Sequence, residues 1–367
     1  MDSSAFLARY WQKQPCLLRQ AFPDFVPFIS RQELFALSTL ESVESRLVLE
    51  QGGEAPWEVL PGPQDEEDLE HLPDSHWSLL VQHVDLHRPE AAALLRRFAF
   101  IPDWRIDDLM ISAAPPGGSV GPHLDSYDVF LLQAAGRRRW QINAGDYSED
   151  DFIPGLDLRI LADFRPQQEW ILEPGDMLYL PPGVAHHGVA LDECLTFSIG
   201  LRAPSRLELL NDWLDDQLVE GGDARYGDPD LTPQENSAEI SAAARARLRR
   251  LLQAPLQDDA ALDRWLGRYL TRLPDHIELP APKRPGTESD GLRCHHACRM
   301  AFFSAADKVL LYVNGREYVL PAACREFAAT LAGARVLAPE QVRTWSAVPE
   351  AAAVLRDLHE QGLLRGD

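Results

Sequence analysis

Two histidines and an aspartate carry the most chemically suggestive spacing in this 367-residue sequence. His123 and Asp125 follow a loop rich in Gly and Pro and precede an apolar run, and a second His-containing segment, Pro-Pro-Gly-Val-Ala-His-His, begins at Pro181. Alternate residues of an extended chain project to the same side, so His123 and Asp125 point together. Two imidazoles and one carboxylate on one barrel form a facial triad that suits non-haem Fe(II) and leaves one face of the metal open. The alternative is a set of ordinary polar residues at a barrel rim.

The third ligand has two candidates. His186 and His187 are adjacent, so a strand would point one of them inward and the other outward. Spacing alone does not choose between them.

Three consecutive arginines occupy positions 137 to 139 on an expected strand. Strand alternation places Arg138 on the same face as Trp140 and Ile142, which predicts that Arg138 points inward. A buried guanidinium needs an anionic partner, and its forked donors suit the far carboxylate of a small diacid. A structural ion pair is the alternative. Ser112, on an earlier strand, is a further candidate donor to that carboxylate.

A β-barrel is needed to bring these residues together. Short apolar segments separated by turns favour an all-β barrel or jelly roll. The expected strands span residues 109–113, 125–133, 137–143, 169–172, 177–180 and 195–201. The acidic stretch 144–166 is expected either to form one wall of a substrate cleft or to be a solvated loop.

The segments before the barrel mix helix and strand signals. A short helix and a strand are expected within 6–22, and two strands within 45–60. Ser30 and Glu33 form a capping box ahead of a helix. Apolar spacing over 75–98 predicts another helix.

Beyond residue 202 the pattern becomes helical. Helices are expected over 205–219, 237–253 and 258–273, with Ser205 and Ser237 as N-caps. Such a block serves either as an oligomer contact or as an intramolecular buttress. A Pro-rich linker at 279–286 leads to a hairpin and small helices that fit a winged-helix module. Because this module lacks a basic stripe, a protein contact is favoured over DNA.

Charge and cysteine content limit the partners and the compartment. With 35 basic and 57 acidic residues the net charge is −22, which disfavours nucleic acid and favours basic polypeptides, although solubility alone also explains acidity. No membrane-length apolar run or signal-peptide pattern is seen, so a cytoplasmic protein is expected. The odd number of cysteines, 5, predicts reduced thiols. Cys294 and Cys298 lack a second ligand pair at zinc-finger spacing, so a structural role is expected.

These motifs together resemble a known family. His123-x-Asp125 with the later His186, the run Leu-Glu-Pro-Gly-Asp-Met-Leu-Tyr-Leu-Pro-Pro-Gly at 172–183, and Ile-Pro-Asp-Trp-Arg-Ile-Asp-Asp at 101–108 are similar to the JmjC family of 2-oxoglutarate oxygenases. Within that family, residues 121–130 and 136–140 resemble the bacterial ribosomal oxygenases. The resemblance covers the chain through the helical block and weakens after it.

The resemblance implies a mainly β fold with additional helices. It predicts a JmjC double-stranded β-helix, which is a cupin-like jelly roll, over 1–204, a helical dimerisation region over 205–278 and a C-terminal winged helix over 279–367. It places the catalytic metal on His123, Asp125 and His186, and the 2-oxoglutarate contacts on Arg138 and Ser112.

The implied reaction uses Fe(II), 2-oxoglutarate and O2 to hydroxylate the Cβ of an arginine side chain in a basic large-subunit ribosomal protein. A homodimer is implied, and neither a membrane nor direct nucleic-acid binding is expected. Two alternatives stay open. One is the same chemistry on a histidine of another ribosomal protein, and the other is a non-catalytic metal-binding cupin that regulates through a DNA-binding winged helix.

Overall fold

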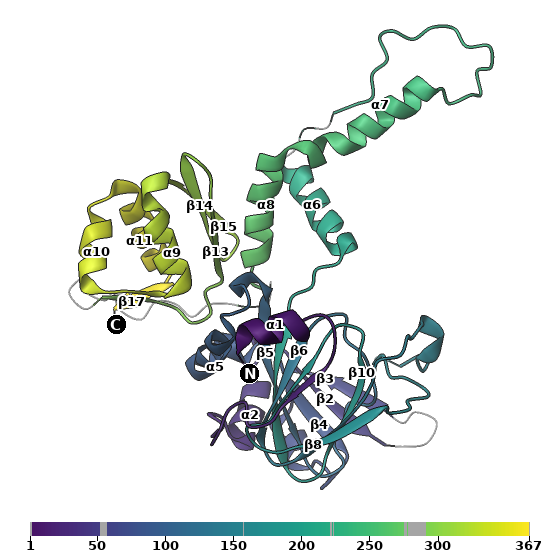
Figure 1. Cartoon of the computed structure of the whole chain (residues 1–367), viewed down its shortest axis with the longest axis vertical. Helices are drawn as coiled ribbons and strands as arrows, with labels where there is room; N and C mark the ends of the chain where they lie inside the picture. Colours follow the sequence, from purple (N-terminus) through teal and green to yellow (C-terminus); the bar gives the residue numbers. More distant parts are fainter. Residues whose placement is uncertain are drawn as a thin grey trace. The chain divides into compact units, whose positions relative to one another are not determined.

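The computed structural model describes residues 2–51, 57–156, 158–220, 222, 224–274, 277 and 291–366. The chain divides into two compact units, one containing Met1–Ala203 and the other containing Pro204–Pro274 and the C-terminal segment. Both are drawn in Figure 1. The expected division into three domains, 1–204, 205–278 and 279–367, stays a prediction, and the linker expected at 279–286 lies outside the described residues.

The first unit is built on two antiparallel sheets. The eight-stranded sheet contains, in spatial order, β1 (Cys16–Leu18), β9 (Met177–Leu180), β6 (Val129–Ala135), β11 (Cys194–Leu201), β5 (Ile106–Ala114), β4 (Trp77–Val81), β2 (Ser45–Glu50) and β3 (Trp57–Pro61). The three-stranded sheet contains β10 (Ala185–Ala190), β7 (Arg138–Asn143) and β8 (Gln168–Leu172). The jelly-roll fold, mainly β with helices, is therefore confirmed.

Strand alternation divides the core between the two faces of the large sheet. Phe130 and Leu132 of β6 belong to a cluster that also contains residues of the surrounding helices. Val129 and Leu131 of the same strand pack instead in a cluster with Trp140 of the small sheet. The large sheet therefore has helices on one face and the small sheet on the other, and the space between the sheets can hold a site.

The helices of this unit are short and locally specified. They are α1 (Ser3–Arg9), α2 (Arg31–Ser38), α3 (Glu66–Glu70), α4 (Val84–His87) and α5 (Pro89–Leu95). The predicted capping box starts α2, because the Glu33 amide donates to Ser30 Oγ at 3.2 Å and the Ser30 amide donates to Glu33 Oε2 at 2.9 Å. Among the residues that the structure describes, no helix combines the length and apolarity needed to cross a membrane.

The helix expected over 75–98 is wrong in its first part. Residues 77–81 form β4, and all five of its residues are buried. Trp77, Leu79 and Val81 pack against the helices, while Ser78 and Leu80 face the cavity between the sheets. Because both faces of this strand are covered, the alternation that marks a strand is lost and the apolar run imitates a helix.

Two further boundaries differ from expectation. The strand expected over 125–133 begins at Val129, so Asp125 lies in the extended segment before it. The helix expected from Ser237 begins at Ala242, and Ser241 caps it by accepting the Ala244 amide at 3.2 Å.

The second unit begins with α6 (Arg206–Glu220), α7 (Ala242–Gln253) and α8 (Asp259–Thr271). Trp213 of α6 meets Trp265 of α8 edge to face at 5.3 Å, and the Trp265 indole donates to Asp212 at 2.8 Å. The remaining elements are two three-stranded sheets with three helices: β12 (Leu292–Cys294), β13 (Met300–Ser304), β14 (Lys308–Val313), β15 (Arg316–Pro321), α9 (Arg325–Gly333), β16 (Val336–Leu337), α10 (Pro339–Ser346), α11 (Pro349–Glu360) and β17 (Leu364–Gly366). The hairpin turn predicted at Asn314 and Gly315 is present, with positive φ at both residues.

Candidate active site

The side chains of His123, Asp125 and His186 meet between the sheets. Their possible ligand atoms all lie within 4.8 Å of one another. The two imidazole centroids are 4.2 Å apart, and His186 Nε2 lies 3.7 Å from Asp125 Oδ2. Among the described residues this is the one group of three or more potential ligands that converges in this way.

Backbone hydrogen bonds hold the three residues in place. The His123 amide donates to the His186 carbonyl at 3.0 Å, and the His186 amide donates to the His123 carbonyl at 2.8 Å. The Gly183 amide donates to the Asp125 carbonyl at 2.8 Å. The Pro-Pro-Gly turn therefore braces the aspartate while the start of β10 braces the first histidine.

The ring nitrogens of both histidines are suitably arranged for a metal. Nδ1 of His123 lies 2.9 Å from the Gly121 carbonyl, and Nδ1 of His186 lies 3.0 Å from the Val184 carbonyl. A carbonyl can only accept, so each Nδ1 carries the proton and each Nε2 is free to ligate. Burial, together with the neighbouring His123, lowers the pKa of His186 to about 4, which keeps that ring neutral. Two imidazoles that can each offer Nε2, together with a carboxylate, fit Fe(II).

His187 points to the other face of β10. Its ring meets Phe164 edge to face at 6.1 Å, on the insertion that follows β7. The structure therefore brings His186, and not His187, next to His123 and Asp125.

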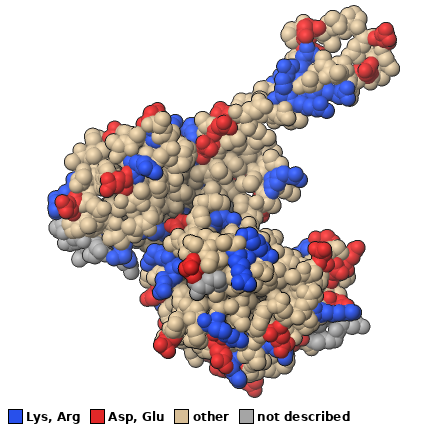
Figure 2. All heavy atoms as spheres, in the orientation of Figure 1, with Lys and Arg blue, Asp and Glu red and all other residues tan. Residues whose placement is uncertain are grey.

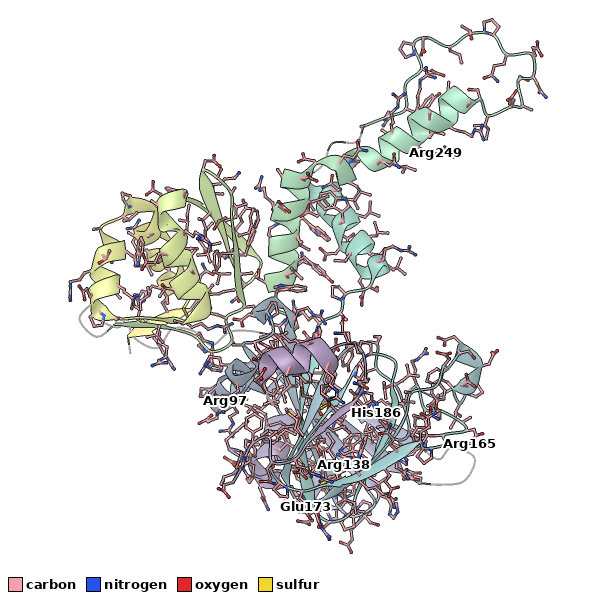
Figure 3. The ribbon with its side chains drawn as sticks, viewed as in Figure 1. Arg97, Arg138, Arg165, Glu173, His186 and Arg249 are labelled. Atoms are coloured by element: carbon pink, nitrogen blue, oxygen red, sulfur yellow. The ribbon has the colours of Figure 1, made fainter. Side chains whose placement is uncertain are left out.

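Arg138 lies deep in the same cavity and is 4% exposed. Its Nη1 donates to Ser112 Oγ at 3.3 Å and to Thr196 Oγ1 at 3.2 Å, and its guanidinium lies 5.3 Å from the Trp140 ring. Figure 3 shows Arg138 and His186 both within the barrel. None of the carboxylates that the structure describes hydrogen-bonds to this guanidinium.

Two buried N–H groups at this site, one on the guanidinium itself and one on a neighbouring indole, are unpaired among the described residues. Arg138 Nε and Trp140 Nε1 are buried without a hydrogen-bond partner among the described residues. Burial also lowers the pKa of Arg138. A buried cation with spare donors and only neutral neighbours is the arrangement expected for an anion site.

Thr196 was not predicted as a site residue. It lies directly opposite Ser112 in the register of β11 and β5, so both hydroxyls reach the guanidinium. A polar residue inside the apolar run 195–201 was the available signal in the sequence.

A cavity of about 420 Å³ joins the candidate metal site to Arg138. Its walls include the acidic residues Glu44, Asp107 and Asp108, as well as Tyr127. Arg46 and Arg159 also line it, so acidic and basic side chains share this cavity. Small-molecule and side-chain sites in proteins are commonly of this size.

Two carboxyl groups in this region are buried: Asp108, which lines the cavity, and Asp85. Asp85 accepts the Leu109 amide at 2.9 Å, and Asp108 accepts the His83 amide at 3.1 Å. Burial, and next the proximity of Asp108, raises the pKa of Asp85 to about 7. Burial, and next Asp107, raises the pKa of Asp108 to about 7.

The cysteines take no part in the converging cluster. All five are buried and free. Cys294 and Cys298 direct their sulfurs toward the carbonyls of Leu331 and Leu363, at 4.0 and 3.9 Å. Burial raises the pKa of both thiols.

Fold and site together define a JmjC domain, and sequence comparison agrees. A JmjC-domain profile matches residues 93–209, and a profile of the AraC-like ligand binding domain matches residues 164–268. The "Ribosomal protein uL16 3-hydroxylase" of Escherichia coli K12 is 40% identical over 281 residues, 76% of this chain and 74% of that protein. The "Probable ribosomal oxygenase" of Haemophilus influenzae is 41% identical over 231 residues, 63% of this chain and 55% of that protein. The chain belongs to the ribosomal oxygenases.

Solved structures extend the similarity to the whole chain. An X-ray structure of E. coli ycfD matches with a TM-score of 0.89 and 34% identity, covering 100% of this chain and 98% of that one. A structure of YcfD in complex with cobalt and 2-oxoglutarate matches with a TM-score of 0.85 and 34% identity, covering 99% of this chain and 98% of that one.

Proposed function

We propose that this chain is an Fe(II)- and 2-oxoglutarate-dependent oxygenase that hydroxylates the Cβ of an arginine side chain in the ribosomal protein uL16. The observation that carries the proposal is that one cavity contains both a His-Asp-His cluster and a buried guanidinium that hydrogen-bonds to none of the described carboxylates. The names of the relatives supply the substrate.

His123, Asp125 and His186 would hold the iron. Iron held there would supply the chemistry that couples oxidative decarboxylation of 2-oxoglutarate to substrate hydroxylation, with one oxygen atom of O2 ending in succinate and the other in the new hydroxyl group. The chain itself supplies position, because the oxidised bond is the one held nearest to the metal.

Arg138 would hold the far carboxylate of 2-oxoglutarate, with the hydroxyls of Ser112 and Thr196 beside it. These hydroxyls already contact the guanidinium, so it is oriented before the co-substrate arrives. Trp140 covers one face of the guanidinium and excludes water from the ion pair.

The acidic wall of the cavity would receive the substrate guanidinium. Glu44, Asp107 and Asp108 line the cavity, and Asp107 is also paired with Arg202 at 3.0 Å. A net charge of −22 also attracts a basic ribosomal protein before contact.

The test is reconstitution of the purified protein with Fe(II), 2-oxoglutarate and uL16, followed by mass spectrometry of uL16. We expect a gain of one oxygen atom that is absent with His123→Ala and with Arg138→Ala. Peptide mapping should place it on an arginine. A hydroxylated histidine in another ribosomal protein, with uL16 unmodified, would contradict the choice of substrate.

We also propose that the protein is a homodimer that acts in the cytoplasm, where ribosomes are assembled. One stripe of α6 supports the dimer: Leu207, Leu210, Leu214 and Leu218 are 67%, 44%, 58% and 75% exposed. This spacing places them on one side of the helix, opposite the side that packs on α8. A row of exposed leucines is a typical self-association surface.

The three-domain organisation is part of the same proposal. Residues 279–367 would form the winged helix, which we expect to contact protein rather than nucleic acid, because the sequence carries no basic stripe there.

A further inference from the structure

A second groove opens beside the active-site cavity, at the edge of the large sheet. Its volume is about 410 Å³, and its walls include Trp57, Glu58 and Val59 of β3 together with Leu156 and Leu158 of the insertion after β7. We propose that this groove binds an extended segment of the basic ribosomal substrate, adjacent to the residue that is hydroxylated. The inference rests on the proposed function and adds to it the surface that the substrate backbone occupies.

The strand registers make the groove and the cavity parts of one surface. Ser112 pairs with Leu80, and Leu80 pairs with Arg46, and all three line the active-site cavity. Two residues further along the strands, and therefore on the same face, Ser78 is opposite Val48, and Val48 is opposite Val59. Residues paired across neighbouring strands share a face, so Val59 and Trp57 continue the wall that begins at Ser112.

The insertion connects the two hollows on the other side. Leu158 lines both the active-site cavity and the groove, and Arg159 and Ile160 continue into the cavity. The groove and the cavity therefore have Leu158 as a common wall residue.

Two buried polar side-chain atoms between the groove and the active-site cavity have no hydrogen-bond partner in the described part of the chain. Ser78 is 0% exposed, lines the cavity, and its Oγ has no hydrogen-bond partner in the described part of the chain. Arg46 Nε is also buried without such a partner. Buried polar groups are normally satisfied, so these two atoms indicate a polar ligand between the sheets.

Strand β3 offers backbone groups to that ligand. It is the last strand of its sheet and, in the described part of the chain, pairs with β2 alone. The outer edge of such a strand carries amides and carbonyls that can pair with an added strand. Peptide recognition by strand addition uses this geometry, with pockets for alternate side chains.

Charge favours a basic peptide as the occupant. Glu58 is exposed on β3, and the insertion presents the exposed acids Asp146, Asp150 and Asp151. Acidic side chains gather on this insertion at the right of the lower unit in Figure 2. Arg159 and Arg165 are already paired with Glu149 and Asp163, so they offset only part of this charge. Arg165 lies at the side of the barrel in Figure 3.

The experiment compares two peptides of uL16. The long peptide extends well beyond the hydroxylated residue on both sides, and the short peptide carries little beyond it. For the long peptide, we expect Glu58→Lys to raise KM about fivefold and Trp57→Ala to raise it about tenfold. For the short peptide and for 2-oxoglutarate, KM should stay at the parent value in both variants. Glu70→Lys, the same charge change at an exposed position on α3, is the matched control and should behave as the parent does.

Backbone methylation tests the strand pairing separately. The long peptide can be N-methylated either at its odd-numbered or at its even-numbered residues. In an added strand, the amides of only one of these two sets point toward β3. We expect one set to lose affinity and the other to keep it. Equal affinity for both sets would overturn strand addition.

The outcomes separate the two proposals. If the parent hydroxylates uL16 but the β3 variants keep the parent KM for the long peptide, the groove is not a docking site. If the variants instead lower the molecular mass in light scattering with KM unchanged, the groove is a contact between copies and the inference is overturned. If the parent fails to hydroxylate any ribosomal protein, the proposed function falls and the inference falls with it.

Discussion

Arg138 is a cation held among neutral groups, and this has a measurable energetic consequence. Burying a charge without an opposite charge destabilises a fold by several kcal/mol, about 3 in typical cases. We therefore expect Arg138→Met to unfold at the same temperature as the parent or a higher one in the absence of 2-oxoglutarate. Adding 2-oxoglutarate should raise the melting temperature of the parent and leave that of the variant unchanged.

The control for this prediction is Arg137→Met. Arg137 directly precedes β7, is exposed and is paired with Asp192. After its replacement, 2-oxoglutarate should still raise the melting temperature as it does in the parent. A variant at Arg138 that still responds to 2-oxoglutarate would place the anion elsewhere.

Asp85 should make stability depend on pH. The pKa of this carboxyl is about 7 in the folded chain, against about 3.9 in an unfolded one, so the unfolded state releases its proton first as pH rises. The stabilising contribution of protonated Asp85 to the free energy of unfolding is therefore complete below about pH 4 and is lost as pH rises toward 7. Asp85→Asn should gain stability relative to the parent, on the order of 2 kcal/mol, between pH 4.5 and pH 8.

Urea unfolding at the two pH values measures this change. Asp65→Asn, at the exposed N-cap of α3, is a suitable comparison because its carboxylate remains in solvent. If the difference in unfolding free energy between parent and Asp85→Asn is the same at both pH values, the pKa of Asp85 is not raised by burial.

The inward direction of a side chain was predictable from the sequence where the two-residue alternation of a strand indicated it. Alternation along β7 predicted that Arg138 points inward, and it is buried with Trp140 and Ile142. Thr196 and Asp108 were missed because their roles depend on which strands become neighbours. That pairing is set by the fold and leaves no local pattern.

At the level of elements, Asp128 joins three segments far apart in the chain. Its carboxylate, 0% exposed, accepts from Tyr179 of β9 at 2.6 Å, from Gln12 after α1 at 2.9 Å and from Arg105 at 3.0 Å. Asp128→Ala would leave a largely buried guanidinium unpaired, so we expect a loss of about 3 kcal/mol in the free energy of unfolding. Chemical denaturation provides the measurement.

A surface ion pair provides the comparison. Glu149 and Arg159 are both exposed, so Glu149→Ala should leave the unfolding free energy almost unchanged. Equal effects of the two substitutions would mean that the Asp128 network does not hold the three segments together.

Strands bounded by turn signals at both ends were easier to predict than strands without them. Met177–Leu180 was predicted with both of its ends correct, because the turn at Gly175 and the Pro-Pro-Gly run bound it. Strand β4 is buried on both faces, as β9 is, but no Gly or Pro follows it directly, so its apolar spacing runs on into the next helices and it was taken for a helix. Local spacing cannot reveal a second covered face, since the covering residues come from elsewhere in the chain.

At the level of the whole molecule, the exposed leucine stripe of α6 predicts self-association. Leu214→Glu places a charge in the middle of the stripe, so we expect a monomer at concentrations where the parent is a dimer. Light scattering measures the mass. Asp215→Lys, exposed and about 100° around the helix from Leu214, should leave the dimer intact. A Leu214→Glu protein that stays dimeric would move the contact to another surface.

The backbone hydrogen bonds between His123 and His186 bear on whether the chain folds before or after it binds its metal. Peptide groups, and not a bound ion, fix the spacing of the two imidazoles, so the barrel is expected to fold before it is loaded. A cell short of iron would then accumulate folded, idle enzyme rather than degraded chain. When iron returns, modification of new ribosomes could resume at the speed of ion uptake, without waiting for protein synthesis.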